Sequence, residues 1–109
     1  ISLEEIHHTQ KLDAPSGTAI SLAEDVISNS NYEQWQLDQA GAGVIPITTI
    51  REPEVPGTHT VDYTSEVDTI SITHQAHNRM GFALGAVIAA EWLHGKQGVY
   101  SMKDVLDIN

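Results

Sequence analysis

The sequence has no cysteine, and only five of its 109 residues are lysine or arginine, against fifteen aspartates and glutamates. Without thiols there is neither a disulfide framework nor a thiolate metal site, which fits a reducing compartment, so we expect a cytoplasmic protein. The formal net charge of -10 opposes binding to nucleic acid or to an anionic membrane, because both surfaces attract basic patches. We therefore expect no nucleic-acid partner and no membrane partner.

Long hydrophobic runs are also absent. The longest, Phe82 to Ala90, is far short of the roughly 20 residues that span a bilayer, and no signal-peptide pattern opens the chain. A composition of 40% hydrophobic and 18% charged residues is typical of a globular protein, and the length predicts one domain over residues 1–109. Because the chain starts at Ile1 rather than Met, we expect that it lacks an N-terminal region.

Residue periodicity predicts both strands and helices. Leu3–His7 is a short segment that we predict to be a strand, and the β-branched residues of Val44–Arg51 predict a second. Alternating residues predict strands at His59–Thr64 and Ile70–Gln75, paired as a hairpin. Helical spacing and capping residues predict helices at Ser16–Ser28, at Met80–Leu93 and from Ser101 through Leu106. The mixed segment Tyr32–Gly43 is expected to be a loop, and Pro46 indicates an edge strand or an irregular start.

These elements predict an α+β fold of the two-layer α/β type. We expect a mixed sheet of about four strands with helices on one face, and burial nearly all round for the apolar helix Met80–Leu93. The strands alternate apolar residues with Thr and Ser rather than with Lys and Glu, so the uncovered face would be neither a dry core nor a charged surface. We expect this face to pack against another subunit of a symmetric oligomer.

The segment Glu5–Ala19 has the residues of an anion-binding site. Asp13 and Ser16 are both good caps for the predicted helix, so Gly17 and Thr18, at or near its first turn, would present unpaired N–H groups at the positive end of the helix dipole. Taken alone, Ser-Gly-Thr is more often just a cap. However, His7, His8 and Lys11 precede it closely in a chain that has few cations, and convergent donors indicate an anionic ligand.

Histidine titrates near neutral pH, so one member of the pair His7 and His8 can act as a general acid, with Lys11 as a fixed positive charge or a second proton donor. A His-His pair alone is more often structural. A metal site is the weakest interpretation and we predict none, because adjacent strand residues point to opposite faces and no third ligand has the usual spacing. His59 and His74 are expected to be packed and hydrogen-bonded.

The run His7-His8-Thr9-Gln10-Lys11-Leu12-Asp13-Ala14-Pro15-Ser16-Gly17-Thr18-Ala19 resembles the active-site segment of the dihydrodipicolinate reductase family. The resemblance continues along nearly the whole chain, through Gly57-Thr58-His59-Thr60, Ile72-Thr73-His74, Arg79-Met80, Trp92-Leu93 and Asp104-Val105-Leu106. Departures from the family pattern fall between Arg51 and Gly57 and at Gln75 and Asn78.

The resemblance implies that this chain is the substrate-binding and tetramerisation part of such a reductase, without its nucleotide-binding Rossmann domain. The substrate would be a cyclic unsaturated dicarboxylate of lysine and diaminopimelate biosynthesis, reduced by NADPH or NADH in a homotetramer. No Gly-x-Gly-x-x-Gly follows a strand here, so this fragment alone is expected to be inactive.

The resemblance also implies residue roles. His7 would be the general acid/base and Lys11 a second proton donor, while His8, Gly17 and Thr18 would bind the substrate carboxylates and Arg79 and Phe82 would face the cofactor. Two alternatives stay open at this point: a non-catalytic ligand-binding oligomerisation module, and a metal-dependent lyase that uses the His pair.

Overall fold

The computed structural model describes residues 1–108 and divides them into two compact units. The first runs from Ile1 to His77 and the second begins at Asn78. None of the helices in the described part of the chain has the length and apolarity that a bilayer span requires.

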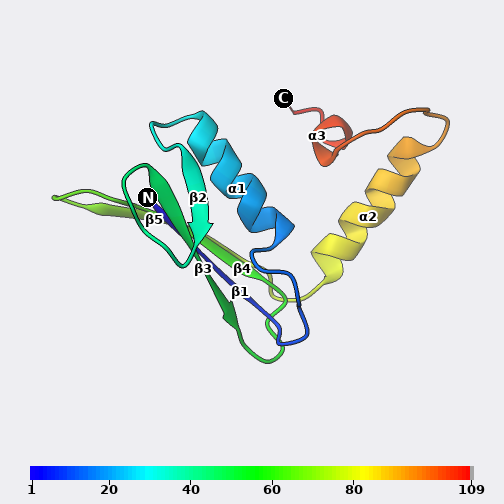
Figure 1. Ribbon diagram of the computed structural model, residues 1–109. Coiled ribbons are helices and arrows are strands. Elements are labelled where there is room, and N and C mark those ends of the chain that lie inside the picture. Colours follow the sequence, from blue (N-terminus) through cyan, green and yellow to red (C-terminus); the bar gives the residue numbers. More distant parts are fainter. Residues whose placement is uncertain (109) are drawn as a thin grey trace. The chain divides into compact units, whose positions relative to one another are not determined.

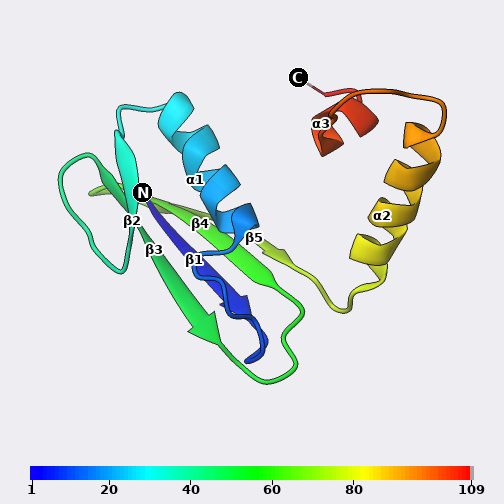
Figure 2. The same ribbon diagram turned by 45° about the vertical axis from the view of Figure 1, so that its right-hand side comes forward.

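The first unit is a five-stranded sheet with one helix on its face (Figures 1 and 2). Along the chain its elements are β1 (Ser2–His7), α1 (Gly17–Ser28), β2 (Gln34–Leu37), β3 (Val44–Arg51), β4 (Thr58–Thr64) and β5 (Thr69–Gln75). The strand order is β2-β3-β1-β4-β5, parallel across β2, β3 and β1 and antiparallel across β1, β4 and β5. The predicted mixed α+β sheet and the β4–β5 hairpin are thus confirmed, with one strand more than expected.

The additional strand is β2, in the segment that the sequence predicted to be a loop. Gln34 to Leu37 alternates polar and apolar residues, but four residues are too few for the alternation to stand out from chance. Because β2 pairs with β3, β3 has neighbours on both sides, so the prediction from Pro46 of an edge strand is wrong.

The core lies between α1 and the centre of the sheet. Ala19 and Ala23, one helical turn apart, are fully buried against a cluster from three strands: Leu3, Ile45, Ile47 and Val61. Small residues let the helix approach the sheet closely, and Ser16 starts the helix by accepting a hydrogen bond from the Ala19 N–H at 3.2 Å. This packing fixes the amino end of α1 over the sheet.

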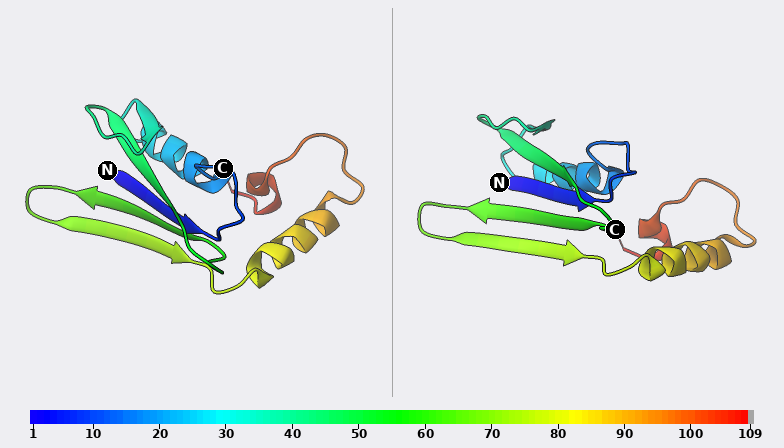
Figure 3. Two further views of the ribbon diagram at one scale, coloured as in Figure 1. Left: turned by 60° about the horizontal axis from the view of Figure 1, so that its bottom comes forward. Right: turned by 90° about the horizontal axis from the view of Figure 1, so that it is seen from below.

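The opposite face of the first unit carries hydroxyl groups. Thr60 and Thr73 face each other across β4 and β5 with their Oγ1 atoms 3.0 Å apart, and Ser71 donates to Asp62. Figure 3 shows the broad sheet that the long β4–β5 hairpin extends. The predicted Thr- and Ser-rich face is therefore present.

The second unit contains α2 (Met80–Leu93) and α3 (Met102–Val105). The bounds of α2 match the prediction, and Gly95, with φ of 78°, follows its end at His94. Ser101 and Asp104 form the expected capping box of α3. The prediction that α2 is buried nearly all round is wrong for the single chain, in which none of its residues is buried. Within its own unit α2 contacts the short α3 and the ring of Tyr100, which are too small to cover it.

Candidate active site

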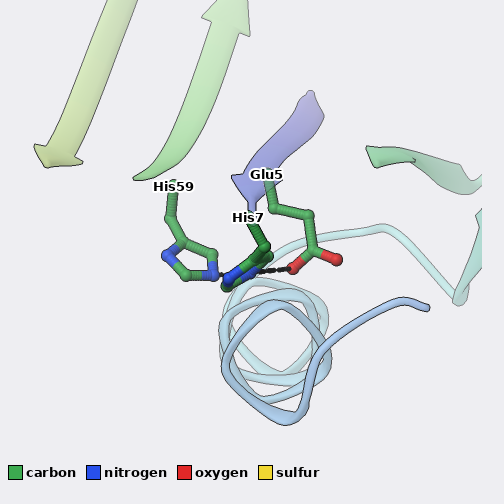
Figure 4. A group of neighbouring side chains, drawn as sticks. All are labelled: Glu5, His7 and His59. Carbon is green, nitrogen blue, oxygen red and sulfur yellow. Dashed lines mark hydrogen bonds and ion pairs between the residues drawn. The ribbon is translucent and has the colours of Figure 1, made fainter. Parts of the chain in front are cut away.

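Three polar side chains are buried together between the sheet and the start of α1. Glu5 and His7 alternate with outward residues along β1, so both point toward α1, with exposed fractions of 0% and 7%. His59 of β4 is directly paired with Glu5 in the antiparallel register and adds its ring on the same face. Figure 4 shows the three side chains converging above the helix.

Ser16 joins this cluster to the helix. Its backbone N–H donates to Glu5 Oε1 at 3.0 Å, and its hydroxyl donates to Glu5 Oε2. The same hydroxyl caps α1 by accepting from the Ala19 N–H. A carboxylate at a helix N-terminus is stabilised by the helix dipole, so the negative charge of Glu5 lies where the fold favours it.

Both imidazoles direct Nε2 at the carboxylate. His7 Nε2 lies 3.2 Å from Glu5 Oε2, and His59 Nε2 lies 3.5 Å from the same oxygen and 3.4 Å from Ser16 Oγ. The two rings meet edge to face with centroids 5.1 Å apart. The prediction that His59 is packed and hydrogen-bonded is confirmed, whereas His74, its partner on β5, is exposed.

The surroundings shift the pKa values of two of these groups. Burial alone would raise the pKa of Glu5, but the hydrogen bonds from Ser16 and the proximity of His7 outweigh it, so the pKa lies below 4.5. Burial lowers the pKa of His59 below 6.5, and the neighbouring His7 adds to this effect while Glu5 opposes it. At neutral pH the cluster therefore combines an ionised Glu5 with a neutral His59.

These shifts predict that acid destabilises the first unit. Below pH 6.5 an unfolded chain binds a proton at His59 that the folded chain resists, and below pH 4.5 the same holds for Glu5, so the free energy of unfolding falls across both windows. Urea unfolding at pH 7.5 and pH 5.5 measures the first window. His59→Gln should reduce the difference between the two pH values, while His77→Gln, at an exposed position, should leave it unchanged. An unaltered difference in His59→Gln would contradict the burial of a neutral ring.

The connection between β1 and α1 is clamped by Arg51, the register partner of His7 on β3. Its guanidinium donates to the carbonyl oxygens of Lys11 at 3.2 Å and of Asp13 at 2.7 Å. The Lys11 ammonium lies 3.0 Å from the Asp13 carboxylate, and the hydrogen bond from Lys11 is the main cause that lowers the pKa of Asp13. The predicted cation is thus held in a loop with a defined backbone.

The first turn of α1 is open. Gly17 and Thr18 are exposed, and a Cβ atom placed on Gly17 would meet nothing within 4 Å. The N–H groups of a first helical turn have no partner inside the helix, so this end of α1 can receive an anion. This end of α1 lies near His7, because Ser16, the residue before Gly17, donates to the same Glu5 carboxylate that His7 contacts.

The structure therefore brings His7 and the amino end of α1 together through Glu5 and Ser16. His8, the next residue on from His7, is half-buried and lies beyond the end of β1. Arg79 and Phe82 belong to the second unit, and their roles stay predictions. The predicted site residues did not include Glu5 or His59. The two-residue spacing of Glu5 and His7 on a strand could have predicted that they share a face. Placing His59 beside them requires the register between β1 and β4.

Glu5, His7 and His59 also form a set that could hold a metal ion, with donor atoms within 4.8 Å of one another. Sequence spacing did not predict this set, because His59 lies far from Glu5 and His7 along the chain. Two imidazoles and a carboxylate suit zinc or iron. However, Ser16 and His7 already donate to both carboxylate oxygens, and the positive end of α1 opposes a cation. The geometry thus favours a hydrogen-bonded network.

A buried His-Glu-His cluster beside an open helix N-terminus, in an α+β domain, is an arrangement suited to binding an anion and to moving a proton. Residues 1–106 match the family model described as "Dihydrodipicolinate reductase, C-terminus". A 4-hydroxy-tetrahydrodipicolinate reductase of Christiangramia forsetii is 59% identical over 107 residues, covering 97% of this chain and 45% of the relative. One from Pseudomonas fluorescens is 41% identical over 118 residues, covering 99% and 44%.

Among solved structures, the chain is similar to one of a dipicolinate-bound dihydrodipicolinate reductase from Paenisporosarcina sp. TG-14. The TM-score is 0.66 at 25% identity, over 94% of this chain and 43% of that one. The chain belongs to the dihydrodipicolinate reductase family and corresponds to its C-terminal part. It spans less than half the length of the curated relatives it matches.

Proposed function

We propose that this chain is the substrate-binding and oligomerisation part of a reductase that transfers a hydride from NADPH or NADH to a cyclic unsaturated dicarboxylate. The reaction would convert dihydrodipicolinate to tetrahydrodipicolinate in lysine and diaminopimelate biosynthesis. The observation that carries the proposal is the His7 imidazole, fixed by a buried carboxylate beside the open amino end of α1. The names of the relatives and of the dipicolinate-bound neighbour support it.

Two anion-binding elements suit a dicarboxylate. One carboxylate would accept hydrogen bonds from the N–H groups of Gly17 and Thr18 and the Thr18 hydroxyl, and the other would bind Lys11 and His8. These contacts would hold the ring in one orientation for hydride delivery. His7 would then protonate the electron-rich ring, with Lys11 as a second proton donor.

The nicotinamide cofactor would supply the hydride. Its phosphates would be held mainly outside this chain, since the sequence has no dinucleotide fingerprint. Within this chain, Arg79 and Phe82 are the proposed contacts with the cofactor. An exposed guanidinium at the start of α2 and a ring that is 54% exposed suit an anionic and aromatic cofactor.

Calorimetry with pyridine-2,6-dicarboxylate, a flat analogue of the substrate, tests the binding role. We expect measurable binding to the chain. Lys11→Ala should weaken it on the order of tenfold, because a charge-assisted hydrogen bond contributes about 1.5 kcal/mol. Lys103→Ala, which removes the same charge from the exposed α3, is the matched control. No binding at all would favour a pure assembly module, and a Lys11→Ala effect confined to thermal stability would make that residue structural.

The hydroxyl-rich face opposite α1 is the proposed oligomer contact. Its threonines and serines can desolvate at less cost than lysines and glutamates would, and one face can serve every copy in a symmetric assembly. Light scattering of the chain at micromolar concentration should give a mass above 11.9 kDa, consistent with a homotetramer. Thr60→Lys, placed in the middle of β4, should shift the mass toward the monomer. A monomeric wild-type chain would contradict this contact.

A further inference from the structure

Glu5 is a fully buried acidic residue that the proposed reaction does not use. Carboxylates are almost never completely buried unless charged or polar partners compensate for lost water. Here the partners come from the candidate site: the Ser16 N–H at 3.0 Å, the Ser16 hydroxyl, His7 Nε2 at 3.2 Å and His59 Nε2 at 3.5 Å. A residue maintained only for packing would not need a charge in this position.

The positions of the protons follow from the donors and acceptors. An ionised carboxylate only accepts, so His7 Nε2, 3.2 Å from Glu5 Oε2, must carry a hydrogen. The single hydrogen of the Ser16 hydroxyl goes to Glu5 Oε2, and its oxygen accepts from the Ala19 N–H. His59 Nε2 therefore faces two acceptors, Ser16 Oγ at 3.4 Å and Glu5 Oε2 at 3.5 Å, and it must donate as well.

Because Nε2 of His7 carries the hydrogen that contacts Glu5, Nδ1 is the ring nitrogen that can exchange a proton with a ligand. That edge of the ring faces Gly57, where a Cβ atom would lie 3.5 Å from both Nδ1 and Cε1. Glycine at this position thus keeps a side chain off the Nδ1 edge. Among the described residues, His59 of β4 contacts the ring edge to face and Arg51 of β3 is the register partner of His7, while the first turn of α1 has no acidic residue.

We propose that Glu5 is the positioning residue for His7: it holds the proton of the neutral imidazole on Nε2, so that Nδ1 takes up and releases the proton in the reaction. The same carboxylate is the counter-ion of the imidazolium form. Ser16 fixes Glu5 and α1 at once, so the proton donor and the anion-binding helix end share one anchor. This inference rests on the proposed role of His7 as the general acid.

The direct test is the location of the imidazole proton. In the full chain with ¹⁵N-labelled histidine, long-range ¹H–¹⁵N spectra above the titration range of the ring distinguish the two neutral tautomers. Wild-type His7 should be the Nε2–H tautomer alone. Glu5→Gln, which keeps the shape but removes the charge, should give a mixture of both. Glu24→Gln is the control, because Glu24 is an exposed residue of α1 beyond its first turn.

The second readout is the steady-state turnover of the complete reductase. Glu5→Gln should lower kcat by on the order of tenfold to a hundredfold, because the general acid His7 is no longer held in one orientation. KM should change by less than about threefold, because the groups that bind the substrate carboxylates are retained. Glu24→Gln should change neither kcat nor KM. A purely structural Glu5 would lower thermal stability and leave kcat per folded molecule and the tautomer unchanged, which would overturn the proposal.

Other outcomes separate this inference from the proposed function. Wild-type His7 protonated on Nδ1, or in a mixture, overturns it even if Glu5→Gln does not fold. A change in the chemical shifts of the histidine ring nitrogens when a chelator is added also overturns the inference, because the cluster would then be a metal site. If the tautomer behaves as expected but His7→Gln keeps full turnover, the positioning is right and the proposed role of His7 is wrong.

Discussion

His7→Gln is expected to lower kcat of the full protein at least about a hundredfold while changing affinity for pyridine-2,6-dicarboxylate only a few-fold. Glutamine keeps a polar, planar group near Glu5, but it cannot give up a proton near neutral pH, and general acid catalysis typically contributes on the order of 10² to 10⁴ in rate. The imidazole contacts Glu5 and the ring of His59 through its side chain, and the backbone of β1 is held by its pairing with β3 and β4, so the change leaves that backbone in place.

Steady-state kinetics at saturating substrate, together with calorimetry, measure the two effects separately. His94→Gln, an exposed position after α2, is the control and should behave as wild type. Equal turnover in His7→Gln and wild type would remove His7 from the chemistry. A loss of affinity as large as the loss of kcat would instead assign His7 to substrate binding.

Ile47→Ala is expected to lower the free energy of unfolding of the first unit by about 3 kcal/mol. The side chain has an exposed fraction of 0% and lies on β3 among Leu3, Ile45 and Ala23, so its removal leaves a cavity that a sheet cannot close. A domain of this size typically has a stability of about 5–15 kcal/mol, so the loss is a large share.

Urea unfolding followed by circular dichroism measures this loss. Val67→Ala, in the turn between β4 and β5 where the side chain is 89% exposed, should cost less than about 0.5 kcal/mol. Similar losses in the two variants would mean that Ile47 is not in the core. A large loss in Ile47→Ala with unchanged ligand affinity in the folded fraction would separate the core from the site.

Much of the fold follows from local patterns. Five apolar positions at helical spacing predicted α1. Asp13 and Ser16 were both predicted as possible caps, and the structure has Ser16 in that position. Alternation predicted β4 and β5, and β-branched residues predicted β3, because each is long enough for its pattern to be visible. The brief segment that ends at His7 predicted β1. The four-residue β2 is defined by its pairing with β3, a contact that no local pattern contains.

The site follows the same rule. The cap, His7 and Lys11 lie within one short segment, so their spacing predicted an anion-binding arrangement. The partnership of Glu5 with His59 depends on the antiparallel register of β1 and β4, two strands separated by some fifty residues of chain. Similarly, the clamp from Arg51 onto the loop of Lys11 depends on the pairing of β1 with β3. Strand register is set by the whole sheet.

The central claim is that His7, Lys11 and the open N-terminus of α1 surround one doubly negative ring. The most direct measurement is a crystal structure of the protein with pyridine-2,6-dicarboxylate bound. We predict one carboxylate within hydrogen-bonding distance of the Gly17 and Thr18 amides, the other at Lys11, and the ring beside Nδ1 of His7. A ligand bound elsewhere, or a ring that leaves His7 and the start of α1 without contact, would contradict the account.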